Sequence, residues 1–137
     1  MIANYLMFIS AVIIGLLGVA HLDLTYRGPK LLPRDPGLKK HMEESALVIT
    51  KQTSYWRAWI GFNASHSLGA IMFGLIYGYL ALFQGDFLFQ SWFFLTLGLA
   101  ALVAYVVMAK LYWFRTPFFG ISLSLVLYVL SVGLSRV

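Results

Sequence analysis

The residues of this chain best suited to chemistry are polar side chains inside long apolar segments. Asn63, His66 and Ser67 are three and four positions apart, so they share one face of a helix. Polar side chains within a membrane span are costly, and a cluster of them indicates a site or a specific helix contact. The candidate ligand-binding residues lie at one end of two apolar segments: His21, Thr25, Trp59, Asn63, His66 and Ser67.

These side chains fit two interpretations. In the first, they are hydrogen-bonding groups between helices, a role worth about 0.6 kcal/mol per bond in membranes. In the second, they line a pocket that opens to the cytoplasmic leaflet and binds a small amphipathic molecule such as a lipid, a quinone or an isoprenoid. Apolar walls with a few convergent polar groups are typical of such pockets. The grouping of two histidines and an asparagine favours the second.

Haem is an alternative ligand, with His21 and His66 as its two axial ligands, because four-helix bundles host haem between facing helices. The two histidines are expected to differ in depth by about one turn, which disfavours ligation of a single iron. No other metal site is predicted, since two histidines without inward carboxylates offer too few ligands. His41 belongs to a hydrophilic segment and is interpreted as a surface residue.

A catalytic site is difficult to build from this sequence. All five acidic residues lie outside the apolar segments or, like Asp23, at the very end of one, which excludes a buried Ser-His-acid set, and the chain has no cysteine. The leading prediction is therefore a non-catalytic small subunit or ligand-binding protein. The alternative is a haem-bearing redox protein or a lipid-modifying membrane enzyme that uses His21 and His66.

The elements that position these residues are predicted from composition and periodicity. Hydrophobic residues make up 61% of the 137 residues and charged residues only 11%, far below the roughly 25% of a soluble domain. We expect an all-α membrane protein with one transmembrane domain over 1–137. It would be an antiparallel four-transmembrane-helix bundle with spans at 2–24, 56–83, 87–112 and 117–134.

The long hydrophilic loop after the first span is predicted to hold an amphipathic helix over 36–54. Asp35 and Pro36 fit its N-cap and first position, and apolar residues recur with helical spacing. Thr116 and Pro117 are predicted to begin the last span in the same way. Asp23 and Arg57, at the facing ends of two spans, are expected to form a structural ion pair.

Small residues in the spans predict close helix contacts. Gly15 and Gly18 would let another backbone approach the first span, and Gly61, Ser65 and Gly69 form a small-xxx-small stripe.

The distribution of lysine and arginine predicts the orientation. Seven of the ten lie between 27 and 57, and Lys110 and Arg115 flank the third connection. By the positive-inside rule, loops one and three are cytoplasmic and both termini lie outside, as in a bacterial inner-membrane protein. The net charge of +5 therefore points to the lipid bilayer as partner and not to nucleic acid. A membrane-protein partner or a homo-oligomer is a further expectation.

The stretch Trp-Arg-Ala-Trp-Ile-Gly-Phe-Asn-Ala-Ser-His-Ser at 56–67, together with His21-x-x-x-Thr25, resembles a small family of four-span bacterial membrane proteins. The resemblance covers most of the chain. It implies the four-span topology and no particular function.

Overall fold

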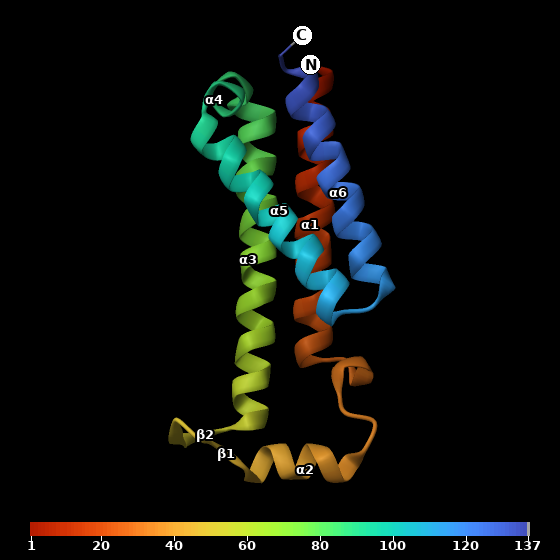
Figure 1. Cartoon of the computed structure of the whole chain (residues 1–137), viewed down its shortest axis with the longest axis vertical. Coiled ribbons are helices and arrows are strands. Elements are labelled where there is room, and N and C mark those ends of the chain that lie inside the picture. The colour runs from red at the N-terminus through yellow and green to blue at the C-terminus, as the bar shows by residue number, and fades with distance from the viewer. Residues whose placement is uncertain (137) are drawn as a thin grey trace. The chain divides into compact units, whose positions relative to one another are not determined.

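The computed structural model describes residues 1–136, and helices account for most of them (Figure 1). Helices and short strands follow in this order: α1 (Ile2–Tyr26), the 3-10 helix η1 (Pro29–Leu31), α2 (Pro36–Glu44), β1 (Ala46–Leu47), β2 (Thr50–Ser54), α3 (Tyr55–Phe83), α4 (Gly85–Gln90), α5 (Trp92–Tyr112) and α6 (Arg115–Leu134).

Four of these helices are long and apolar enough to cross a membrane: α1, α3, α5 and α6. The shortest, α6, has 20 residues, which at 1.5 Å per residue equals the roughly 30 Å of a hydrocarbon core. The predicted all-helical protein with four apolar spans is confirmed at this level. The first two spans begin and end within two residues of their predicted limits.

The third predicted span, 87–112, is wrong at its start, because the helix is interrupted at Ser91, between α4 and α5. Ser91 has extended backbone angles, and its hydroxyl accepts from the Phe94 amide at 3.4 Å. A serine side chain competes for nearby backbone amides and therefore favours a helix N-cap over a helix interior.

The last span begins earlier than predicted. Phe114 is the N-cap residue and α6 starts at Arg115, so Thr116 and Pro117 lie inside the first turn. Proline fits there because the first four amides of a helix have no intrahelical acceptor.

The predicted amphipathic helix over 36–54 is wrong beyond Glu44. Its start is confirmed, since the Asp35 carboxylate accepts from the Gly37 amide at 2.8 Å and Pro36 occupies the first position. After Glu44 the chain instead forms a two-stranded antiparallel hairpin from β1 and β2. Strand β2 contains Thr50 and Thr53, whose β-branched side chains favour extended backbone over helix.

The chain forms two compact units where a single domain over 1–137 is predicted. Unit 1 comprises Met1–Leu17 and Ala70–Val137, and unit 2 comprises Gly18–Gly69. Helices α1 and α3 each contribute a part to both units.

Unit 1 is held by apolar packing and by buried serines. Ser10 and Ser124 exchange hydrogen bonds between α1 and α6, each hydroxyl reaching the other residue's carbonyl at 2.8–2.9 Å. The Ser131 hydroxyl donates to the Ala3 carbonyl at 2.7 Å. These bonds satisfy polar groups that have no water to bind inside an apolar core.

A glycine contact brings α1 and α3 together within unit 1. A Cβ atom on Gly74 would lie 2.7 Å from the Gly15 Cα and 2.9 Å from the Ala11 carbonyl oxygen. The two backbones are therefore too close for any side chain at this position, as predicted for Gly15. At Gly61, in unit 2, the predicted close contact is wrong: the residue is exposed, and a Cβ there would meet nothing within 4 Å.

Candidate functional site

The centre of the candidate site is a hydrogen bond in unit 2 between α1 and α3. His21 Nε2 donates to Asn63 Oδ1 at 3.0 Å. The other end of the same amide is also engaged, since Asn63 Nδ2 donates to the Trp59 carbonyl oxygen at 2.8 Å. The amide orientation is thus set by α3 itself, and it requires the His21 Nε2 to carry a proton. His21 and Asn63, which the sequence places at the same end of two apolar segments, are therefore neighbours in the structure.

His66 completes a cluster of three polar side chains. Its ring lies against the His21 ring, with centroids 5.6 Å apart and planes at 89°. His66 follows Asn63 by three residues on α3, so the two lie on one helix face. Two imidazoles and one amide from two helices therefore form one continuous polar surface.

Thr25 and Ser67 are satisfied by their own helices. The Thr25 hydroxyl donates to the His21 carbonyl at 2.7 Å, and the Ser67 hydroxyl donates to the Asn63 carbonyl at 2.8 Å. Both side chains are buried. Each hydroxyl thus binds the backbone of the residue that carries a cluster side chain, and only its oxygen lone pairs remain to accept from another group.

Trp59 lies one turn before Asn63 and stacks on Trp56, with ring centroids 5.2 Å apart. The Lys39 ammonium of α2 lies 5.3 Å from the Trp56 ring centre, a cation–π contact between α2 and α3. The aromatic pair thus links the polar cluster to the hydrophilic segment of the same unit.

The cluster is not sealed inside the protein. His21, Trp59, Asn63 and His66 are all half-buried, in contrast to Ser67, which is fully buried. Part of the surface of each of these four residues therefore remains accessible.

Asp23 has a different partner from the predicted Arg57. Its carboxylate pairs with Arg27, four residues later and just past the end of α1, at 3.3 Å, and both side chains are mostly exposed. An (i, i+4) pair needs no tertiary contact, and at such exposure it contributes little to stability.

The arrangement does not suit a haem between His21 and His66. Axial imidazoles must face each other across the macrocycle, whereas these rings touch edge to face, and His21 Nε2 already donates to Asn63. Over residues 1–136, no group of three or more His, Cys, Asp or Glu side chains is placed to hold a metal ion.

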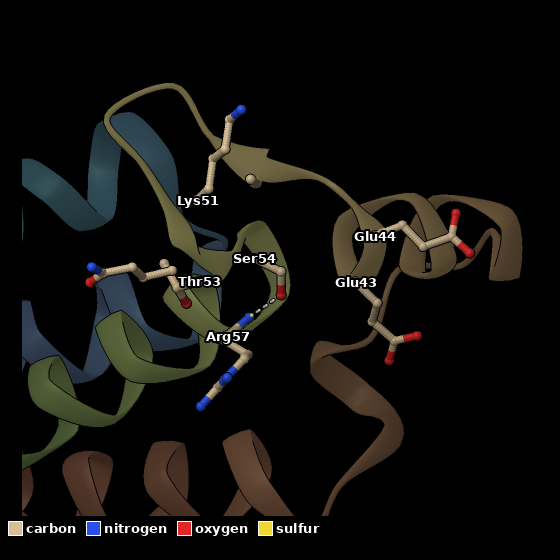
Figure 2. Close-up of a pocket in the computed structure, with 8 residues that line it drawn as sticks. Glu43, Glu44, Lys51, Thr53, Ser54 and Arg57 are labelled. Atoms are coloured by element: carbon tan, nitrogen blue, oxygen red, sulfur yellow. Dashed lines mark hydrogen bonds between the residues drawn. The ribbon is translucent and has the colours of Figure 1, made fainter.

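A second feature of unit 2 depends on the hairpin and was therefore missed in the sequence. An open hollow of about 300 Å³ lies among the end of α2, the hairpin and the start of α3 (Figure 2). Figure 2 shows the charged ends of Glu44 and Lys51 pointing in different directions, and Arg57 lies on the far side from Glu44. The charged groups that line the hollow do not converge on a common point, so the histidine cluster is the stronger candidate site.

No protein-family model, no curated protein and no solved structure matches this chain. The sequence and the structure define its class: an all-helical protein with four helices long and apolar enough to cross a membrane. The resemblance to a four-span bacterial family stays a prediction.

Proposed function

We propose that this chain is an integral protein of the bacterial inner membrane that binds a small amphipathic molecule and does no chemistry on it. The ligand would be a lipid, a quinone or an isoprenoid, bound at His21, Asn63 and His66 near the cytoplasmic leaflet. The observation that carries the proposal is the half-buried cluster itself, in which α1 and α3 supply two imidazoles and an amide to one surface.

The depth of the cluster is the physical reason to expect a ligand. His66 lies eleven residues beyond the first residue of α3, about 16 Å along the helix, and His21 lies five residues before the last residue of α1, about 8 Å. A polar surface open to hydrocarbon at that depth is costly. A ligand with a polar head and an apolar tail would hydrogen-bond the cluster and leave its tail among lipid chains.

The membrane arrangement belongs to the same proposal. Four spans in an antiparallel bundle, with loops one and three cytoplasmic, would place the cluster in the cytoplasmic half. Two contacts support antiparallel packing of α1 and α6, because Ala3 meets Ser131 and Ser10 meets Ser124. The lysines and arginines between 27 and 57 support the orientation.

Native mass spectrometry after mild detergent extraction tests the proposal. We expect the wild-type chain to keep a non-covalent adduct with the mass of a lipid, quinone or isoprenoid, and Asn63→Ala and His66→Ala to lose it. Ser65→Ala is the matched control, since Ser65 is exposed on the same helix and its hydroxyl donates to the Phe62 carbonyl of that helix. A wild-type chain without an adduct, or equal retention by all variants, would overturn the proposal.

A further inference from the structure

The tip of the hairpin has an unusual sequence. Leu47 pairs with Thr50, so Val48 and Ile49 alone form the turn between β1 and β2. Two-residue hairpin turns favour glycine, asparagine and aspartate, which adopt positive φ easily. No residue in the range 1–136 has positive φ. Turn geometry therefore gives no reason for two branched aliphatic residues at this place.

Packing gives no reason either. Val48 is 105% exposed and Ile49 is 89% exposed, so neither side chain covers the rest of unit 2. Apolar groups gathered at an exposed tip are typical of a surface that meets a membrane or a partner.

The tip is tied closely to a membrane-spanning candidate. Strand β2 ends at Ser54 and α3 begins at the next residue, while the Tyr55 amide donates to the Ser45 carbonyl at 2.9 Å. Ile49 precedes Tyr55 by six residues, at most about 20 Å of extended strand. If α3 spans a bilayer, the hairpin tip cannot move far from the headgroup layer.

Charge indicates which surface the tip meets. Unit 2 contains seven lysines and arginines against four acidic residues, a net charge of +3. The ion pairs found over 1–136 are local pairs on α1 and α2 and leave four basic side chains of unit 2 without a carboxylate: Lys30, Arg34, Lys51 and Arg57. Lys51 lies two residues beyond Ile49. Basic residues beside an apolar tip complement an anionic lipid surface.

We propose that Val48 and Ile49 insert into an anionic lipid leaflet, so that the hairpin anchors the hydrophilic segment of unit 2 to the membrane surface. The proposal rests on the proposed membrane placement of α3 and is independent of ligand binding at the histidine cluster. The two aliphatic side chains enter the boundary between headgroups and acyl chains, and the neighbouring basic side chains contact lipid phosphates.

Site-directed spin labelling tests this directly, because the chain has no cysteine. The full chain is reconstituted in nanodiscs of phosphatidylcholine and phosphatidylglycerol and labelled at Val48→Cys, Gln52→Cys or Phe62→Cys. Phe62, an exposed residue of α3, reports whether the helix is in lipid, and Gln52 is the matched polar position on the hairpin. Collisions of the label with oxygen, which concentrates in lipid, are compared with collisions with a water-soluble nickel complex.

We expect oxygen collisions to dominate at residues 48 and 62 and nickel collisions to dominate at residue 52. In phosphatidylcholine alone, the label at residue 48 should become more accessible to nickel, because the basic side chains lose their anionic partners. A lipid-exposed residue 62 with a water-exposed residue 48 would overturn the hairpin anchor alone. A water-exposed residue 62 would overturn the membrane placement and the anchor with it. Equal nickel accessibility of residue 48 in both bilayers would overturn the role of anionic lipid.

Discussion

Asn63 is the residue through which the candidate cluster is assembled. Its carbonyl oxygen accepts from His21, its amino group donates to Trp59, and its backbone carbonyl accepts from Ser67. One side chain thus joins α1 to α3 while its own helix fixes the direction of the amide. Loss of this side chain should disturb the contact between the helices as well as the polar surface.

A double-mutant cycle measures the strength of this contact. We expect His21→Ala and Asn63→Ala to be non-additive, with a coupling of about 0.6–1.7 kcal/mol, the range of interhelical hydrogen bonds in membranes. The measurement is the free energy of unfolding in mixed detergent micelles. The control pair is His21→Ala with Ser65→Ala, which should be additive because Ser65 bonds only its own helix. Additivity in the His21–Asn63 cycle would contradict the contact.

The sequence predicted part of this cluster because depth along a helix can be counted from the ends of an apolar segment. That reasoning made His21 and Asn63 neighbours without any tertiary information. The same reasoning gave Asp23 the wrong partner, because two exposed arginines, Arg27 and Arg57, were available to it. Arg27 follows Asp23 by four residues, just past the end of α1, and needs no tertiary contact, whereas pairing with Arg57 requires the ends of two helices to meet.

Among the elements, the contact of α1 with α3 in unit 1 depends most sharply on one position. A Cβ on Gly74 would overlap the Gly15 backbone, whereas a Cβ on Gly61 of the same helix would meet no atom within 4 Å. Both glycines lie within one apolar helix and looked equivalent in the sequence. Only the neighbouring helix distinguishes them.

Alanine substitution should separate these two glycines. We expect Gly74→Ala to lower the free energy of unfolding by about 1–3 kcal/mol, because helix α1 must move away to admit the methyl group. Gly61→Ala should leave stability unchanged or raise it by up to about 1 kcal/mol, since alanine favours the helix. Denaturant titration in micelles gives both values. A Gly74→Ala protein as stable as Gly61→Ala would contradict the backbone contact.

The hairpin after α2 and the interruption of the helix at Ser91 show why the end of α2 and the start of α5 could not be predicted. The apolar residues after Asp35 keep helical spacing as far as Ile49, so periodicity alone extended α2 through a segment that forms strands. Periodicity measures which residues share a face, but it does not measure the preference of the β-branched Thr50 and Thr53 for extended backbone. At Ser91, one side-chain cap divides an apolar segment that is otherwise continuous.

For the whole molecule, the orientation in the membrane is a prediction that the sequence makes and that accessibility can test. Lys51→Cys and Asp86→Cys place single thiols on exposed residues of the hairpin and of α4. We expect a membrane-impermeant maleimide to label residue 86 on intact spheroplasts and residue 51 only in inverted vesicles. The opposite pattern would reverse the orientation, and labelling of both residues from one side would contradict a membrane crossing by α3.

The bonds from Ser10 to Ser124 and from Ser131 to Ala3 also bear on how the chain is made. They join residues 114 and 128 positions apart, so α1 cannot find these partners until the last helix has left the ribosome. Unit 2 ends at Gly69 and can close its contacts much earlier in synthesis. During the interval, Ser10, the one serine of α1, is without its final acceptor. Assembly of this protein should therefore be sensitive to the time between insertion of its first helix and insertion of its last.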